Sequence, residues 1–263
     1  MTVAEALRLA EQRLAEAGVD TPRVDAELLV AHVLGVSRTG GYAERDREVP
    51  DGVELLLERR RKREPLAYVL GEWGFRRLTL KTDARALVPR PETEVLVERA
   101  LALISDMPEP RVLDVGVGCG AIALAIADEH PGSRVTGVDK SPDALALARE
   151  NAQSLGIDID LRTGGADVAA EGWDLVVSNP PYVAQAALSS LQPELRWEPY
   201  AALVDTGLHE EIARVADTRW LVLEVGDGDA PRVAELLSSL GYAEVTISPD
   251  LSGRERVVEG RQL

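Results

Sequence analysis

Residues 111–120 read RVLDVGVGCG, a short apolar strand that runs directly into a turn with three glycines. After this turn the chain alternates between apolar helices and apolar strands. Strands separated by helices of ten or more residues indicate a mostly parallel sheet with helices on both faces. The sequence therefore predicts an α/β fold with a doubly wound, mostly parallel seven-stranded sheet. We expect its strands at residues 111–115, 134–138, 157–159, 174–177, 220–225, 245–247 and 256–258.

The residues before this sheet have a different pattern. Helical periodicity at residues 2–17, at residues 21–35 and after Asp51 predicts a small helical bundle over residues 1–70. Residues 71–88 alternate like a β-hairpin and are interpreted as a linker to the sheet domain, residues 89–263. The bundle contains a basic run, Arg59 to Arg63, at a helix end. We favour a solvated helix face there over contact with an acidic partner or RNA.

Residues 89–94 read PRPETE and precede a helical pattern. The dense prolines predict a fixed loop, and Thr93 is expected to cap the helix. Arg90 and Glu92 place opposite charges in this one tight loop. They are interpreted as either an internal brace or part of a pocket wall.

The charge is strongly negative, at −16 over 263 residues, and it is unevenly distributed. Residues 1–75 hold 11 basic and 14 acidic residues, whereas the remainder holds 18 and 31. Nonspecific affinity for nucleic acid comes mostly from neutralising phosphates. DNA and RNA are therefore disfavoured as direct binding partners.

The single cysteine, Cys119, excludes an internal disulfide and fits a reducing compartment. It is interpreted as a small packed residue rather than a nucleophile. The three histidines lie far apart without ligand spacing, so we expect no metal site. No apolar stretch approaches the ~20 residues that would span a membrane, and the start lacks the features of a signal peptide. We expect a soluble, cytoplasmic protein and a monomer.

The glycine turn between the first strand and the first helix lets a ligand approach the backbone closely. Its glycines are Gly116, Gly118 and Gly120, and Asp139 follows at the end of the second strand, where it can accept both hydroxyls of a ribose. This pattern fits a dinucleotide as well as S-adenosylmethionine. The glycine loop alone does not separate the two ligands.

Two further acids favour a cationic amino-acid cofactor. Asp114 would face a bound phosphate unfavourably but an ammonium group favourably, and Asp167 lies where an adenine amino group is expected. The alternative is that both acids only cap turns. Residues 178–182 read SNPPY after the fourth strand, and the two prolines stop this strand rigidly at its carboxyl end. An Asn amide, a backbone carbonyl and an aromatic ring are thereby presented to a planar amide or amidine nitrogen.

Taken together, these motifs resemble the HemK-type (PrmC) peptide chain release factor N5-glutamine methyltransferases. The resemblance covers nearly the whole chain, and the motifs occur in the family's order: residues 64–68, 88–94, 114–120, 178–182, 198–203, 224–226 and 253–256. Val117 and Cys119 stand where the family commonly has hydroxyl residues, and Val168 replaces an aromatic residue at the adenine site. The segment from Asp205 to Leu221 is short and lacks the usual Pro-Gly turn.

The resemblance implies a class I S-adenosylmethionine-dependent methyltransferase domain with an N-terminal substrate-binding bundle. It implies methyl transfer to the glutamine of a Gly-Gly-Gln motif in release factors, with S-adenosylhomocysteine as product and without a metal. The implied cofactor residues are Asp114, Gly116, Val117, Gly118, Cys119, Gly120, Asp139, Asp167 and Val168. We expect direct in-line transfer, with the amide held by the Asn179 side chain and the Pro180 carbonyl, Pro181 stiffening the loop and Tyr182 packing over the amide.

Several alternatives stay open. The Asn-Pro-Pro-Tyr tetrapeptide also occurs in adenine-N6 methyltransferases that act on DNA or RNA, although the acidic charge argues against a nucleic-acid substrate. A glutamine of a ribosomal protein is a nearer competitor. An oxidoreductase that binds a dinucleotide at the glycine loop and a non-catalytic adaptor are the candidates from other functional classes.

Overall fold

The computed structural model describes residues 1–262, apart from the side chains of Tyr42 and Ser189. The chain forms two compact units. The first contains Met1–Glu72 together with Gln192–Trp197, and the second contains Trp73–Leu191 and Glu198–Leu263. The first unit is therefore assembled from two separate stretches of chain, which the sequence did not predict.

The first unit is helical, as expected, and contains α1 (Val3–Glu16), α2 (Pro22–Leu34), α3 (Val53–Arg61) and the short α4 (Leu66–Leu70). A capping box begins α1, because the Thr2 side chain accepts from the Glu5 backbone and the Glu5 carboxylate accepts from the Thr2 backbone. Leucines and alanines of α1, α2 and α3 form its buried core.

The interpretation of the basic run as a solvated face is wrong for two of its residues. Arg60 is buried and pairs with Asp25 at 2.7 Å and with Glu194 at 2.8 Å. Arg63 pairs with the same Glu194 at 2.7 Å. These guanidinium groups hold α2, α3 and the 192–197 stretch together inside the first unit.

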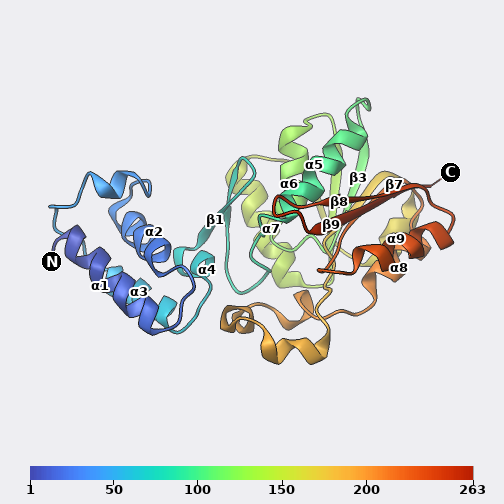
Figure 1. The fold of residues 1–263 in the computed structure, drawn as a ribbon. Coiled ribbons are helices and arrows are strands. Elements are labelled where there is room, and N and C mark those ends of the chain that lie inside the picture. Colours follow the sequence, from blue (N-terminus) through green and yellow to red (C-terminus); the bar gives the residue numbers. More distant parts are fainter. Residues whose placement is uncertain (263) are drawn as a thin grey trace. The chain divides into compact units, whose positions relative to one another are not determined.

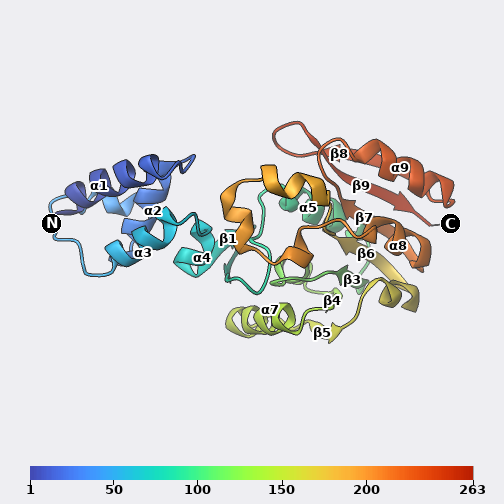
Figure 2. The same ribbon diagram turned by 90° about the horizontal axis from the view of Figure 1, so that it is seen from below.

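The second unit contains the predicted seven-stranded sheet, with the order β5-β4-β3-β6-β7-β9-β8 (Figures 1 and 2). The first five strands in this order, β5 to β7, are parallel to one another, and β9 pairs antiparallel with both β7 and β8. This arrangement confirms the predicted fold class. The strands are β3 (Arg111–Val115), β4 (Arg134–Asp139), β5 (Asp160–Thr163), β6 (Trp173–Ser178), β7 (Thr218–Glu224), β8 (Ala243–Pro249) and β9 (Glu255–Arg261).

The third strand of this sheet begins later than predicted, at Asp160 rather than at residue 157. The preceding helix, α7 (Pro142–Leu155), ends with Gly156 in the left-handed conformation. The Ile157 N–H then donates to the Ala152 carbonyl at 3.1 Å. Residue 157 is thereby used in ending the helix and is not available for the sheet.

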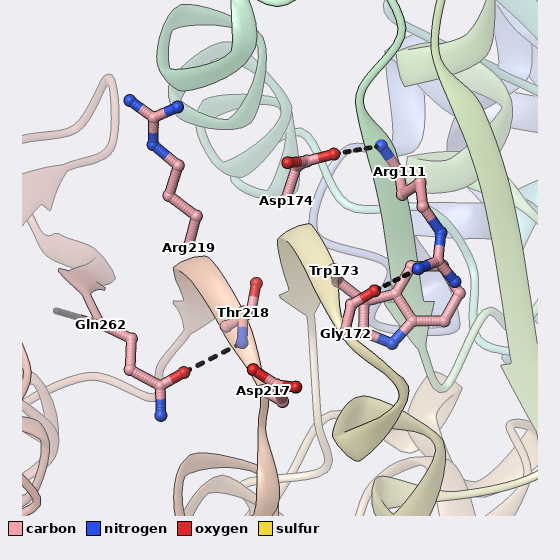
Figure 3. A pocket seen from close by; sticks show the side chains of 8 residues that line it. All are labelled: Arg111, Gly172, Trp173, Asp174, Asp217, Thr218, Arg219 and Gln262. Atoms are coloured by element: carbon pink, nitrogen blue, oxygen red, sulfur yellow. Dashed lines mark hydrogen bonds between the residues drawn. The ribbon is translucent and has the colours of Figure 1, made fainter.

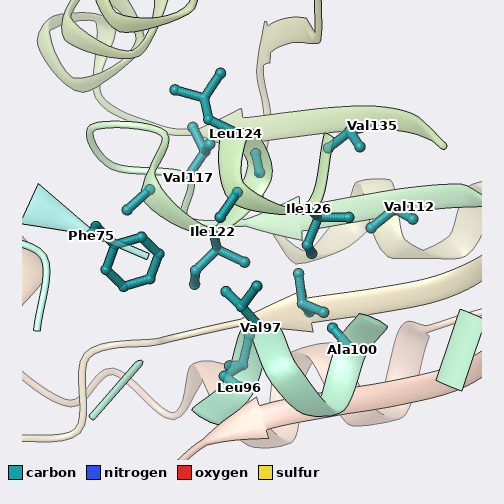
Figure 4. Close-up of a cluster of buried hydrophobic side chains, with 14 of the residues drawn as sticks. Phe75, Leu96, Val97, Ala100, Val112, Val117, Ile122, Leu124, Ile126 and Val135 are labelled. Carbon is teal, nitrogen blue, oxygen red and sulfur yellow. The ribbon is translucent and has the colours of Figure 1, made fainter. Parts of the chain in front are cut away.

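Helices cover both faces of the sheet. On one face, α5 (Thr93–Ile104), α6 (Ala121–Glu129) and α7 pack over Val112, Leu175 and other alternate strand residues; Figure 4 shows part of this cluster. On the other face, α8 (Leu208–Val215) and α9 (Ala230–Ser239) pack over Leu113, Val176 and their neighbours. Because strand side chains alternate, one apolar strand contributes to both cores.

The expected hairpin is formed by β1 (Glu72–Phe75) and β2 (Leu78–Lys81), which make a two-stranded sheet. It is fixed by the fully buried Asn151 of α7. This side chain accepts from the Lys81 N–H at 2.7 Å and donates to the Lys81 and Cys119 carbonyls. A single amide therefore joins the hairpin to the glycine turn. In the described part of the chain, no helix is both long and apolar enough to cross a membrane.

Replacing Asn151 with alanine is expected to lower the free energy of unfolding by roughly 2–4 kcal/mol, since one buried and two partly buried backbone groups lose their partner. Gln153→Ala, on an exposed position of the same helix, serves as the control and should change it by less than about 0.5 kcal/mol. Urea unfolding followed by circular dichroism measures both. Equal stability of the two variants would show that the amide does not hold the hairpin.

Candidate active site

A cavity of about 540 Å³ lies at the carboxyl ends of β3, β4 and β6. Its volume is in the range of small-molecule binding sites, roughly 300–1,000 Å³. The glycine turn, the end of β4 and the Asn-Pro-Pro-Tyr segment all contribute to its wall. The predicted residues that line it are Gly116, Val117, Gly118, Cys119, Asp139, Asn179, Pro181 and Arg90.

The three glycines of the turn all have positive φ, at +78° for Gly116, +56° for Gly118 and +91° for Gly120. A side chain at these positions would strain the backbone. A Cβ on Gly120 would also lie 2.9 Å from Leu124, whereas a Cβ on Gly116 would meet no atom within 4 Å. Gly120 is thus required for packing beneath the loop, and Gly116 leaves open space above it.

Asp139 fixes this loop as well as lining the cavity. One carboxylate oxygen accepts from the Gly118 N–H at 3.0 Å, and the other accepts from the Ser141 N–H at 2.8 Å. Each oxygen keeps a further lone pair, because a carboxylate can accept about four hydrogen bonds. The carboxylate is therefore held in a fixed orientation at the cavity wall and can accept further hydrogen bonds.

Asp114 does not line the cavity, although direct contact with a cationic ligand was predicted from the sequence. It is fully buried below the loop, where Oδ2 accepts from the Ala123 N–H at 3.2 Å and Oδ1 has no hydrogen-bond partner among residues 1–262. Burial raises its pKa to about 7, and the charge of Asp139 adds to this shift. Asp114 therefore lies beneath the loop and hydrogen bonds with the start of α6 instead of contacting a ligand.

The side chains of Asp167 and Val168 also lie outside the cavity wall. Asp167 is exposed and accepts from the Gly165 N–H at 3.1 Å, while Val168 is buried against Gly164. The backbone of Gly164 and Gly165 lines the cavity instead. Lys140, directly after Asp139, lines it too and was missed by the sequence reasoning. Its position directly after Asp139, the acid that ends β4, could have indicated Lys140 as a cavity residue.

Cys119 fits the interpretation as a small packed residue. It is buried, and burial raises the pKa of its thiol to about 12. The thiol therefore stays protonated at neutral pH and is a poor nucleophile. Among residues 1–262, no cluster of three or more His, Cys, Asp or Glu side chains is arranged to hold a metal ion.

The Asn-Pro-Pro-Tyr segment follows β6 directly. Ser178 anchors the strand end through a hydrogen bond to the Val115 carbonyl at 2.6 Å. Asn179 and Pro181 reach the cavity, whereas Pro180 is buried. The Tyr182 ring does not line the cavity and lies against Gly226, where a Cβ would come within 3.1 Å of its Cδ2 atom. Burial raises the pKa of Tyr182 to about 12, so its hydroxyl is protonated at neutral pH.

Thr93 does not cap its helix, because α5 begins at Thr93 itself. Its hydroxyl instead accepts from the Asn179 side-chain N–H at 3.1 Å. The two residues are 86 positions apart in the chain, and both line the cavity. This contact fixes the orientation of the Asn179 amide.

The charged loop before α5 is braced from within the second unit. Glu198 is buried, accepts from the Val88 N–H at 3.1 Å and pairs with Arg90. Arg90 is thus both a brace and part of the cavity wall. Glu92 is exposed and does not line the cavity, so the pocket-wall interpretation fails for that residue. Glu198 was not singled out as a site residue from the sequence.

A second hollow lies at the opposite ends of β3, β6 and β7 (Figure 3). There Arg111 stacks 4.7 Å over the Trp173 ring and donates to the Gly172 carbonyl at 2.6 Å. The Asp174 carboxylate accepts from the Arg111 backbone at 2.8 Å. These polar groups satisfy one another, and parallel sheets bind ligands at the other edge. We therefore assign the site to the cavity at the carboxyl edge.

Comparison with known proteins gives matches over both units. Residues 5–71 match the PrmC N-terminal domain, and residues 93–207 match the methyltransferase small domain. The release factor glutamine methyltransferase of Deinococcus radiodurans is 41% identical over 278 residues, covering 100% of this chain and 99% of that protein. The one of Escherichia coli (strain K12) is 38% identical over 260 residues, covering 92% and 93%.

A solved structure, the hMettl16 catalytic domain in complex with MAT2A 3'UTR hairpin 6, has a TM-score of 0.57 and 14% sequence identity. The match covers 69% of this chain and 74% of that chain. At this identity the likeness concerns the fold alone.

The buried Asp114 makes stability depend on pH in a predictable direction. Its pKa rises from 3.8 to about 7 on folding, so between these values the folded state binds more protons than the unfolded state. Its contribution to the free energy of unfolding is therefore largest at low pH and is lost as pH rises towards 7. Asp114→Asn removes this titration.

We expect the wild type to lose stability relative to Asp114→Asn as pH rises from 5 to 8. Urea unfolding of both proteins at the two pH values measures the difference. If the difference in unfolding free energy does not change with pH, Asp114 is charged in the folded protein throughout.

Proposed function

The chain belongs to the release factor glutamine methyltransferase family, and we propose that it transfers a methyl group from S-adenosylmethionine to the side-chain amide nitrogen of the glutamine in the Gly-Gly-Gln motif of release factors. One observation carries the proposal. The glycine turn after β3 and Asn179 after the adjacent β6 line the same cavity. In our proposal, the glycine turn holds the cofactor and Asn179 holds the acceptor amide, both at this one edge of the sheet.

The residues present fit S-adenosylmethionine. The left-handed glycines leave the backbone open to a ligand, and Asp139 is oriented for the two hydroxyls of a ribose. Lys140 and the backbone of Gly164 and Gly165 extend the cavity wall beyond Asp139, where the adenine ring would be held. When bound, S-adenosylmethionine supplies an electrophilic methyl group on a sulfonium.

The other half of the site has to orient the acceptor. An amide nitrogen is a poor nucleophile, because its lone pair is delocalised into the carbonyl. The Asn179 side-chain oxygen and the Pro180 carbonyl would each accept one N–H and direct the lone pair for in-line transfer. Among residues 1–262, no backbone N–H donates to the Pro180 carbonyl, although Pro180 itself is buried and does not line the cavity. Orientation of this kind can supply on the order of 7–11 kcal/mol in favourable cases.

The reaction needs no general base before transfer, because the amide loses its proton afterwards. The two weak acids in this region agree with such a mechanism. Cys119 and Tyr182 both have their pKa raised to about 12 by burial, so neither is a base at neutral pH. Pro181 would stiffen the loop. The Tyr182 ring lies against Gly226 outside the cavity wall, so the expected packing of this ring over the acceptor amide is not part of the proposal.

We further propose that the helical first unit binds the release factor. Its match to the PrmC N-terminal domain supports this role, since a relative named for that substrate aligns with the whole of this chain, including this unit. The net charge of −16 does not favour a nucleic-acid acceptor. The domain boundaries at residues 70 and 88 stay a prediction.

Asn179→Ala is expected to abolish methyl transfer, because the acceptor amide loses one of its two orienting groups. Binding of S-adenosylmethionine should stay within about threefold of wild type. Transfer from labelled cofactor to a purified release factor gives the first quantity, and titration calorimetry gives the second. A DNA duplex and a ribosomal-protein glutamine are tested as rival acceptors; labelling of either in place of the release factor would refute the proposed substrate.

Asp139→Ala is expected to weaken cofactor binding, since the carboxylate both shapes the glycine loop and faces the ribose. In a thermal-shift assay, S-adenosylmethionine should raise the melting temperature of the wild type but not that of Asp139→Ala. Asp167→Ala is the matched control, because that carboxylate lies outside the cavity. Protection of the wild type by NAD rather than S-adenosylmethionine would indicate the oxidoreductase alternative.

A further inference from the structure

Two loops of the second unit hold large apolar side chains out in solvent. Tyr200 is 58% exposed, and Leu251 is 99% exposed. Single exposed apolar residues are common on protein surfaces and indicate nothing by themselves. These two share a position and a means of support: both lie at the edge of the sheet that carries the cavity, and a buried carboxylate braces each loop.

Tyr200 lies beside the cavity, in the short 3₁₀-helix Tyr200–Ala202. Its neighbours Pro199 and Ala201 line the cavity, whereas Tyr200 itself does not. The Tyr200 carbonyl accepts from two backbone N–H groups, at 3.1 and 3.2 Å, and this tight turn closely follows the buried Glu198. The aromatic ring is therefore presented next to the cavity by a backbone that is held in place.

Leu251 lies in the loop between β8 and β9. Because β7 and β8 both pair antiparallel with β9, they run in the same direction, and the loop leaves β8 at the edge of the sheet that carries the cavity (Figure 2). The side chain of the buried Asp250 accepts from the Ser252 and Arg254 N–H groups at 2.9 and 3.0 Å. It also pairs with the buried Arg256 at 3.4 Å. These bonds hold the backbone on both sides of Leu251.

Arg256 also joins this loop to the Asn-Pro-Pro-Tyr segment. Its guanidinium donates to the Val225 carbonyl at 2.9 Å. The next residue, Gly226, lies against the Tyr182 ring. The loop of Leu251 is therefore connected by direct contacts to the segment that carries Asn179.

We propose that Tyr200 and Leu251 are anchors that dock the protein carrying the acceptor glutamine. The inference rests on the proposed function, which makes the acceptor a side chain of a folded protein and not a free molecule. When that side chain reaches Asn179 in the cavity, the protein around it has to lie against the loops at the same edge. Apolar side chains on fixed loops suit such contact, because little conformational freedom is lost when they are covered.

The occupant that fits this surface is a folded domain that carries its glutamine on a protruding loop and has apolar surface beside that loop. Tyrosine is enriched among the residues that contribute most to the binding energy of protein interfaces. A second copy of this chain is the other candidate for covering the two side chains. Its signature would be a dimer of the enzyme alone.

The first test measures steady-state kinetics with a release factor as acceptor. Tyr200→Ser and Leu251→Ser should each raise the KM for the release factor at least about fivefold, the effect expected for an interface anchor. The kcat and the KM for S-adenosylmethionine should stay within about threefold, because neither side chain lines the cavity. Tyr200→Phe and Leu251→Met keep the apolar surface and should retain the wild-type KM. An unchanged KM in either serine variant would overturn the role of that residue, and so would a loss confined to kcat.

Val215→Ser is the matched control. Val215 is 39% exposed, ends α8 and shortly precedes β7, so it lies at the opposite edge of the sheet. Its substitution should leave the KM for the release factor within about twofold of wild type. A rise equal to that in Tyr200→Ser and Leu251→Ser would contradict docking at the carboxyl edge.

Direct binding separates this inference from the proposed function. Titration calorimetry of the release factor into each protein should give weaker binding for both serine variants than for the wild type. If the wild type methylates the release factor and the serine variants bind it as tightly, only the docking proposal fails. If binding depends on Tyr200 and Leu251 but no methyl group is transferred, only the proposed function fails. A dimer in sedimentation that the serine substitutions dissociate would make a second copy the occupant and refute the docking proposal.

Discussion

The site depends on the parallel pairing of β3 with β4 on one side and with β6 on the other. Neighbouring parallel strands end at the same edge, and at β3 the strand order reverses direction across the sheet. The loops that leave β3 and β6 therefore diverge and leave a space between them. Asp139 at the end of β4, the glycine turn after β3 and Asn179 after β6 surround this space. Without these two ladders, the three motifs would be unrelated parts of the chain.

Around this space the protein buries acids that a simple core would avoid. Asp114 and Glu224 each have a pKa raised to about 7 by burial, and Glu198 is shifted in the same direction. Strongly shifted acids cluster at functional sites more than elsewhere. Two of the three contact a segment that shapes the cavity: Asp114 contacts the start of α6, and Glu198 contacts the loop of Arg90. Burying these acids lowers the stability of the fold, but their contacts hold the polar groups of the cavity wall in place.

The sequence predicted the sheet and the motifs that lie at its edge, because strand ends and glycine turns follow local rules. It did not predict Thr93 as a partner of Asn179, since local rules assign a threonine before a helix to capping. Glu198 was missed for a related reason: its partners, Val88 and Arg90, lie more than 100 residues away in the chain. Asp114, Asp167 and Val168 were expected at the cavity on the basis of spacing alone. Spacing places a residue near a loop but does not determine which side of the loop it occupies.

The two stretches that make up the first unit have a consequence for how the protein can be divided. Glu194 lies 131 residues after Arg63 in sequence, yet it belongs to the helical unit and joins Arg60 and Arg63 there. A gene fragment that begins at residue 73 would carry Glu194 without these cations. One that ends at residue 72 would leave Arg60 with half of its anions. The protein therefore consists of two units in space that do not correspond to two separable segments of its gene, and neither unit can be exchanged between relatives by a single crossover.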